Sequence, residues 1–215
     1  DQRPLGAMPT LAPSGRFPPL AALYKAGMLR RLPLAEIEAE IGRQVESFIA
    51  RFGGPPAYFD GHHHVHQLPG VRDIVIGFAA RLGTGRIWVR CCHERPSTVA
   101  RRGVATAKAL VIGALGKGLA RRAARAGVPV NDGFSGAYDF AAEKRPFAAL
   151  AARFVEDARE NSLMMCHPGY ADAALAELDV MTTARDDEHA FLMSDAWPAL
   201  LAARGLEIGP FRHRA

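Results

Sequence analysis

The hydrophobic positions between residues 34 and 52 recur at intervals of three and four. The apolar residues that follow this spacing are Leu34, Ile37, Ile41, Val45, Phe48, Ile49 and Phe52. Glu and Arg occupy many of the remaining positions, so one face of a helix would be apolar and the opposite face charged. Pro33 precedes the segment and Gly53-Gly54-Pro55 follows it. The pattern therefore predicts an amphipathic helix of about five turns.

Strand-like and helical segments alternate along the rest of the chain. Strands are predicted at 57–65, 86–91, 128–134, 162–170 and 206–211, and helices at 20–29, 70–83, 98–126, 143–160 and 185–205. Such alternation is typical of parallel strands joined by helical crossovers. It predicts an α/β fold, either a doubly wound sheet or a (β/α) barrel, with functional residues at the carboxyl ends of the strands.

Polar residues cluster where four of these strands are predicted to end. The clusters are His62–His66, Arg90 to Glu94, Asn131-Asp132 and His167. Four separate strand ends with potential ligands or acids favour the mouth of a barrel over scattered surface residues.

Four histidines lie within residues 62–66, two positions after Asp60. In a strand, alternate residues share a face at a spacing of about 6.6–7 Å. His62, His64 and His66 would then point the same way as Asp60, and two such imidazoles can bind one cation. The alternative is a set of histidines that only form hydrogen bonds. Because four occur together, the sequence favours a metal site, whose other ligands must come from elsewhere in the chain.

His167 follows the apolar residues of "MMCHPGY" and is fixed by Pro168-Gly169. It is a candidate for a third metal ligand or for a general acid, because the ordinary pKa of histidine lies near neutral pH. A purely structural histidine is the alternative. Cys166 is a weaker candidate for a nucleophile, because in a strand it would point away from the face of its neighbour.

Composition narrows the class of protein. The chain has 215 residues, a net charge of +5 and only three cysteines without disulfide-framework spacing, which fits one large domain or two small ones in a reducing compartment. No apolar run approaches the roughly 20 residues that span a bilayer, and no signal-peptide pattern occurs, so we expect a cytoplasmic protein. Aromatic residues make up 8% of the chain and do not interleave with the basic ones, which disfavours nucleic-acid binding.

Two motifs give the chain a family resemblance. "DGHHHVHQLPGV" (60–71) followed by "CHPGYAD" (166–172) resembles the YdjC-like (ChbG/HpnK) carbohydrate deacetylases. "RPLGAMPTL" (3–11) and "ELDVMTTARDDEHAFL" (177–192) extend the resemblance over essentially the whole chain. It implies a distorted TIM-like barrel, with residues 1–215 as a single domain. It also implies a metal-dependent hydrolase that removes the N-acetyl group from an acetylated amino sugar.

The same resemblance implies roles for individual residues. His62 would bind a divalent metal ion, Mg²⁺ or Zn²⁺. Asp60 would assist beside it, and His167 would be the catalytic proton donor across the mouth of the barrel. The residues expected to line the substrate site are His64, His66, Arg90 and Asp132.

The chain departs from the family pattern at its start. An Asp-Asp-Phe-Gly motif and a Gly-x-His-Leu motif, which supply a metal-binding carboxylate, the catalytic base and a second histidine ligand, do not occur. Asp1 would begin just after the second motif, so we expect an incomplete barrel that lacks its first strands, binds metal weakly and turns over poorly. Two alternatives remain: a non-catalytic barrel that binds a sugar or a partner, and another metallohydrolase such as a phosphoesterase.

Residues 95–131 contain eight Lys or Arg and no acid. One hypothesis is that residues 101–127 contact an anionic membrane and present the site to a lipid-linked amino sugar. "NDGFSGAYDF" (131–140) likewise resembles the hopanoid-associated HpnK branch of the family. The favoured alternative is a solvated outer helix with an Arg-rich face. A homodimer is a further hypothesis.

Overall fold

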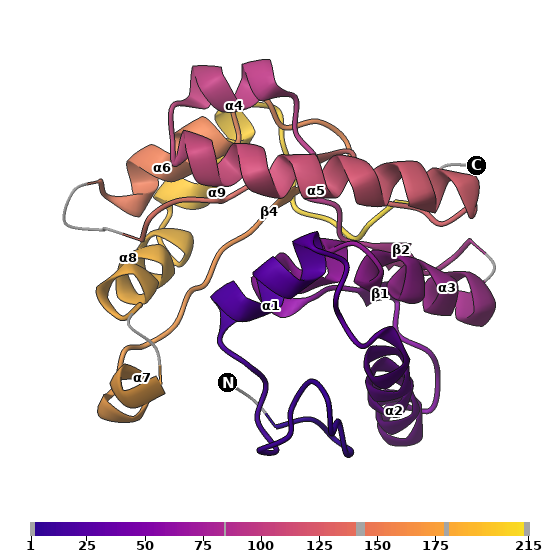
Figure 1. The fold of residues 1–215 in the computed structure, drawn as a ribbon. Coiled ribbons are helices and arrows are strands. Elements are labelled where there is room, and N and C mark those ends of the chain that lie inside the picture. The colour runs from indigo at the N-terminus through magenta and orange to yellow at the C-terminus, as the bar shows by residue number, and fades with distance from the viewer. Residues whose placement is uncertain (1–2, 84, 141–144, 179–180, 213–215) are drawn as a thin grey trace. The chain divides into compact units, whose positions relative to one another are not determined.

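The computed structural model describes residues 3–83, 85–140, 145–178 and 181–212 (Figure 1). The chain divides into two compact units, and each is described by itself. The first unit comprises the residues up to Cys91 together with Leu115–Asn131. The second comprises Cys92–Ala114 and the residues from Asp132 onward. Helix α5 (Thr106–Arg125) contributes its first half to the second unit and its remainder to the first.

The first unit pairs two short parallel strands with helices. Its elements are α1 (Leu20–Met28), α2 (Leu34–Phe52), β1 (Tyr58–Phe59), the 3₁₀ segment η1 (His62–Gln67), α3 (Val71–Gly83) and β2 (Trp88–Val89). Strand β1 pairs with β2 in the register Tyr58 to Trp88 and Phe59 to Val89. An isolated parallel bridge from Val89 to Val130 adds one more pairing beside β2.

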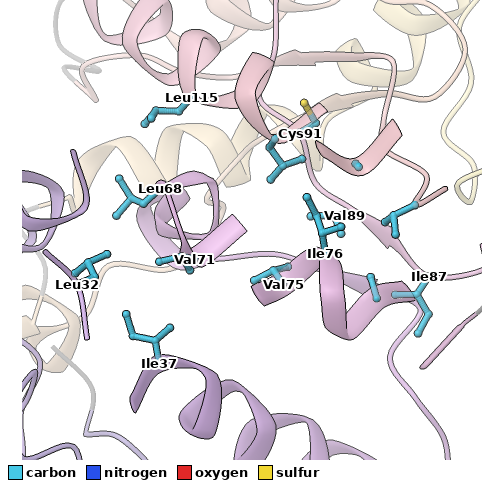
Figure 2. Close-up of a cluster of buried hydrophobic side chains, with 14 of the residues drawn as sticks. Leu32, Ile37, Leu68, Val71, Val75, Ile76, Ile87, Val89, Cys91 and Leu115 are labelled. Atoms are coloured by element: carbon cyan, nitrogen blue, oxygen red, sulfur yellow. The ribbon is translucent and has the colours of Figure 1, made fainter. Parts of the chain in front are cut away.

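The core of the first unit gathers apolar side chains from elements far apart in the sequence (Figure 2). Leu68, Val89 and Leu119 are fully buried within it. Helix α2 confirms the periodicity prediction and ends at Gly53, which adopts a left-handed conformation (φ 76°) that glycine tolerates. Only part of its apolar stripe is covered, because Phe48 and Phe52 are 38% and 67% exposed.

The second unit is built on another parallel pair of strands. Its elements are α4 (Pro96–Arg102), β3 (Gly133–Ser135), α6 (Phe147–Phe154), β4 (Ser162–Met164), α7 (Ala173–Leu178), α8 (Thr183–Leu192) and α9 (Ala196–Ala203). Strand β3 pairs with β4 in the register Gly133 to Ser162 through Ser135 to Met164. One buried cluster surrounds Phe134, and another surrounds Tyr138, Phe147 and Phe154.

The parallel pairing confirms an α/β protein, but several predicted elements differ. Residues 206–211 form no strand, and the other strands are two or three residues long. The predicted helix 98–126 is broken at Gly103 (φ 64°) into α4 and α5. The predicted helix 143–160 shortens to α6, and its residues 143–144 lie outside the described ones. The predicted helix 185–205 divides into α8, which begins two residues earlier than predicted, and α9.

The described ranges contain two separate two-stranded sheets, so no closed barrel is found among them. The single domain predicted over residues 1–215 stays a prediction. None of the described helices has the length and apolar character that crossing a membrane requires.

Candidate active site

The histidine cluster does not form the strand that its sequence predicts. Residues His62–Gln67 form a 3₁₀ segment, within which His63 and His64 have left-handed backbone angles (φ 50° and 62°). Because the backbone turns, the alternation of faces expected for a strand is lost. His62 and His63 are exposed with ring centroids 4.0 Å apart, whereas His64 and His66 are buried. The prediction that His62, His64 and His66 share one face of a strand is therefore wrong.

Gly61 allows the chain to fold back on itself before this segment. A Cβ atom at this position would lie 2.8 Å from both Cβ and Nδ1 of His66 and 2.9 Å from its backbone nitrogen. These distances are shorter than real Cβ contacts, so any side chain here would displace His66. The glycine thus places His66 directly beneath the turn.

Arg90, at the end of β2, holds the cluster together. Its guanidinium forms an ion pair with the Asp60 carboxylate and donates hydrogen bonds to His64 Nδ1 (2.8 Å) and to the Gly61 carbonyl (3.0 Å). The carbonyl oxygen of Arg90 lies 2.8 Å from His66 Nε2. Arg90 is itself buried, at 5% exposure. The structure therefore brings together Asp60, His64, His66 and Arg90 within the first unit.

These hydrogen bonds fix the protonation of both buried histidines. An arginine only donates, so His64 Nδ1 must accept and His64 is neutral with its proton on Nε2. His66 donates from Nε2 to the carbonyl of Arg90, which leaves its lone pair on Nδ1. Burial, reinforced by the charge of Arg90, lowers the pKa of His66 from 6.5 to about 4. His66 Nδ1 lies 3.9 Å from Asp60 Oδ1 and has no hydrogen-bond partner.

The donor set of this cluster offers few ligands to a metal ion: the exposed imidazoles of His62 and His63 and the buried Nδ1 of His66. Among the described residues, no group of three or more His, Cys, Asp or Glu side chains is placed to hold a metal. The Asp60 carboxylate and His64 Nδ1 are engaged by Arg90, whose positive charge opposes a cation at the same place. His62 remains as an exposed imidazole. The cluster alone therefore does not form the three-ligand site typical of catalytic metals.

His167 lies in the second unit, three residues beyond the end of β4. Its backbone N–H donates to the carboxylate of Glu188, and its ring Nδ1 lies 3.9 Å from Glu188 Oε1. The ring meets Phe140 edge to face, with centroids 5.2 Å apart. The His167 side chain is 28% exposed, so it remains accessible to a small molecule.

Glu188 is the residue that sequence reasoning missed. It lies on α8 with 0% exposure, and its carboxylate accepts a hydrogen bond from the Tyr138 hydroxyl. Burial, followed by this hydrogen bond, raises the pKa of Tyr138, which keeps the phenol protonated as a donor. A signal was available: Glu188 follows the buried Ala184 by four residues, on the helix face where an apolar residue is expected.

Cys166 has the environment of a structural thiol. Burial, with a smaller contribution from the Glu188 carboxylate, raises the pKa of Cys166 from 9.0 to about 11. The thiol is therefore protonated at neutral pH, which agrees with its low rank as a nucleophile.

Asp132 lines a cavity of about 270 Å³ in the second unit. The buried pair of Arg102 and Glu94 forms part of the wall, with Nη1–Oε2 and Nη2–Oε1 distances of 2.7 and 2.6 Å. The structure corrects the expected position of Asp132, which precedes β3 rather than following it. Because β3 and β4 are parallel, Asp132 and His167 lie at opposite ends of this strand pair.

A family model and individual known proteins both match this chain over nearly its whole length. The family model described as YdjC-like protein matches residues 2–203. A chitooligosaccharide deacetylase from Serratia marcescens is 29% identical over 226 residues, covering 98% of this chain and 73% of the relative. One from Yersinia pestis (strain Pestoides F) is 30% identical over 217 residues, covering 97% and 72%.

A solved structure supports the fold. The crystal structure of a candidate cellobiose-phosphate cleavage protein from Enterococcus faecalis V583 superposes with a TM-score of 0.64. The match covers 96% of this chain and 70% of that one at 18% sequence identity, so the likeness concerns the fold alone. Since the family model spans nearly the whole sequence, the chain belongs to the YdjC-like protein family.

Proposed function

We propose that this chain is a carbohydrate deacetylase, a hydrolase that cleaves the N-acetyl amide of an acetylated amino sugar. The observation that carries the proposal is its similarity, over at least 97% of its length, to several proteins named chitooligosaccharide deacetylase. These names favour an oligosaccharide substrate. A lipid-linked glycoside, as in the HpnK branch, is the finer alternative, supported by the "NDGFSGAYDF" segment.

We further propose that the reaction uses a divalent ion, Mg²⁺ or Zn²⁺, to which this chain contributes His62. His62 is chosen because the family resemblance assigns the metal to the first histidine of the cluster, and its ring is exposed, whereas Arg90 engages His64 and the Asp60 carboxylate. A divalent ion held there would polarise the acetamide carbonyl toward attack by water. Asp60 assists by fixing Arg90, and through Arg90 it orients the neighbouring imidazoles.

His167 protonates the departing amine in this proposal. Its imidazole is part exposed, and an imidazole is a common general acid in enzymes. Arg90 and His64 are proposed to contact the sugar, whereas the contact of Asp132 with the sugar stays a sequence prediction, because Asp132 lies at the end of the β3–β4 pair opposite to His167. His66 is only 2% exposed, which favours a supporting role beneath them over direct contact.

The test measures acetate release from N-acetylated chito-oligosaccharides by the complete gene product that carries this chain. His62→Ala is expected to lose bound metal, measured by elemental analysis, and activity together. His167→Ala is expected to keep the metal and to lose about 100-fold in kcat. His63→Ala, which alters the exposed neighbour of His62, is the matched control.

The results of these assays test the role of His62, the role of His167 and the deacetylase activity separately. Wild-type turnover with bound metal in either variant would remove the role given to that histidine. No acetate release from any acetylated amino sugar would remove the deacetylase proposal itself. The second candidate is a non-catalytic sugar binder, and the observation that favours it is that the described residues form no group of three or more His, Cys, Asp or Glu side chains placed to hold a metal. It predicts calorimetric binding of the oligosaccharide without hydrolysis.

Peripheral membrane contact through residues 101–127 stays a proposal tied to the lipid-linked substrate. Several cationic side chains of this segment are paired within their own unit, which favours an outer helix instead. The pairs are Arg101 with Asp157, Arg102 with Glu94, Arg122 with Asp73, and Lys108 with the carbonyl of Tyr138. A cytoplasmic location and a homodimer likewise stay proposals.

A further inference from the structure

A buried carboxylate lies directly behind the candidate proton donor. Glu188 is 0% exposed, and two donors hold its carboxylate: the Tyr138 hydroxyl at one oxygen and the His167 backbone N–H at the other. Tyr138 is also buried, at 2% exposure. An acid this deep is costly to bury unless its hydrogen bonds are satisfied, so Glu188 occupies a built position rather than a chance one.

The ring of His167 faces this carboxylate through one nitrogen. His167 Nδ1 is buried, makes no hydrogen bond and lies 3.9 Å from Glu188 Oε1. The side chain as a whole is 28% exposed, so its accessible surface belongs to other atoms of the residue. Phe140 meets the ring edge to face at 5.2 Å and limits its rotation.

The partner of one imidazole nitrogen decides what the other can do. A carboxylate that accepts from Nδ1–H fixes the tautomer and the ring orientation, and leaves Nε2 for the reacting group. The present separation of 3.9 Å is longer than a hydrogen bond. Catalytic hydrogen bonds are often long before substrate binds and shorten in the complex.

We propose that Glu188 is a positioning residue for His167, whose Nδ1–H donates to the Glu188 carboxylate while Nε2 faces the substrate. The direction of proton transfer rests on the proposed deacetylase function. After water adds to the acetamide carbon, the C–N bond breaks and its electron pair stays on nitrogen. That nitrogen takes the proton from Nε2 of the imidazolium, the two protons of the added water pass to bulk water, and the acetyl group leaves as acetate. His167 ends neutral, with its remaining proton on Nδ1 toward Glu188.

Tyr138 completes the arrangement from the other side. Its hydroxyl holds one carboxylate oxygen of Glu188, so the carboxylate cannot turn freely away from the ring. The preceding acid on the same helix, Asp187, has a different task, because its Oδ2 accepts from the Phe147 backbone N–H at 2.6 Å. The substitution Asp187→Asn is therefore a matched control, because it removes a negative charge one residue away from Glu188 and leaves the Glu188 carboxylate beside His167 unchanged.

The test combines imidazole nitrogen NMR with kinetics on the complete protein. In the wild type we expect neutral His167 to carry its proton on Nδ1, with the signal assigned by its loss in His167→Gln. In Glu188→Gln the amide N–H₂ can donate to Nδ1 instead, so we expect the proton to move to Nε2. We expect kcat to fall about 10- to 100-fold with KM within roughly twofold of wild type. Asp187→Asn should change neither the spectrum nor kcat.

Two results would overturn the proposal. One is a wild-type His167 with its proton on Nε2, a measurement that needs no variant and stands even if Glu188→Gln fails to fold. The other is a folded Glu188→Gln protein with the wild-type spectrum and the wild-type kcat. Failure of the deacetylase function looks different: the wild-type protein then releases no acetate, while the spectrum still reports on Glu188 and His167.

Discussion

At the scale of single residues, Arg90 makes its neighbours depend on one another. The guanidinium of Arg90 binds the Asp60 carboxylate and the ring of His64, and the backbone carbonyl of Arg90 accepts a hydrogen bond from His66. The sequence showed that Asp60 and the histidines are adjacent, and it placed Arg90 at a neighbouring strand end. The sequence could not show that Arg90 contacts all of these residues, because nothing in the residue pattern indicates that His63 and His64 adopt left-handed backbone angles.

The burial of His66 makes stability depend on pH. Its pKa of about 4 in the folded protein lies below the ordinary value of 6.5, so between these two pH values the unfolded chain binds a proton that the folded one does not. The contribution of His66 is therefore complete above pH 6.5 and is lost as the pH falls toward 4, by up to about 3 kcal/mol. We expect the free energy of unfolding in urea to be lower at about pH 5 than at about pH 7.5.

Variants identify the residue responsible for this pH dependence. His66→Gln keeps a donor toward the carbonyl of Arg90 but cannot titrate, so the difference between the two pH values should shrink. His62→Gln changes an exposed imidazole of the same segment and serves as the control. An unchanged pH dependence in folded His66→Gln would contradict the assignment.

At the scale of elements, the sequence predicts a helix most accurately where the apolar periodicity extends over many residues. Helix α2 follows its apolar spacing over the full range Leu34–Phe52. The strands were overestimated, because a short apolar run shows that residues are buried but not how many backbone groups find a partner. The break at Gly103 was missed because the Ala- and Arg-rich residues on both sides favour helix. Glu188 was missed because burial of a carboxylate depends on donors distant in sequence, such as Tyr138.

The β3–β4 pair depends on a glycine where β3 ends. Gly136 has a φ of +99°, and a Cβ atom there would lie 2.0 Å from the Met165 carbonyl oxygen. Both the backbone angle and the space therefore exclude a side chain. We expect Gly136→Ala to lower the free energy of unfolding by about 3 kcal/mol or to prevent folding. Chemical denaturation measures the change.

Gly209 is the matched control for this element. It lies in the same unit, is exposed, and an added Cβ would meet nothing within 4 Å. Gly209→Ala should stay within about 0.5 kcal/mol of wild type. Equal stability of the two variants would mean that the close approach of Gly136 and Met165 is not a constraint.

At the scale of the whole molecule, the net charge is +5, but only some of the basic side chains that the structure describes are unpaired at the surface and available to a partner. Arg101, Arg102 and Arg122 each form an ion pair within their own unit, while Lys117, Arg121 and Arg125 are exposed on α5. Exposed basic residues attract anionic surfaces at low salt, and the attraction weakens as salt screens it.

Sedimentation with anionic vesicles measures how strongly the exposed basic residues of α5 bind the protein to an anionic membrane. We expect weak pelleting at low ionic strength that is lost at about 0.15 M salt. Replacing Lys117, Arg121 and Arg125 by Gln should remove it, and neutral vesicles provide the control. Pelleting that persists at the higher salt would instead support apolar insertion through the exposed Leu110 and Val111.

Two short sequence motifs, and not the predicted fold, indicate the family of this chain. "DGHHHVHQLPGV" and "CHPGYAD" pointed to the YdjC-like proteins, and the family model matches residues 2–203. The strand geometry predicted for the first motif was wrong even so. A motif identifies residue types at a given spacing, whereas the turn at Gly61 depends on packing against His66.

The state of the three cysteines has a practical consequence for experiments on this protein. Cys91 and Cys92 are buried, and the Cys166 thiol, with its pKa near 11, is a poor nucleophile at neutral pH. Maleimide reagents should therefore leave the native chain largely unmodified. A cysteine substituted for an exposed residue in each unit, such as Arg86 and Ala199, would react selectively. Paired spin labels or fluorophores could then follow the separation of the two units in solution as sugar is added.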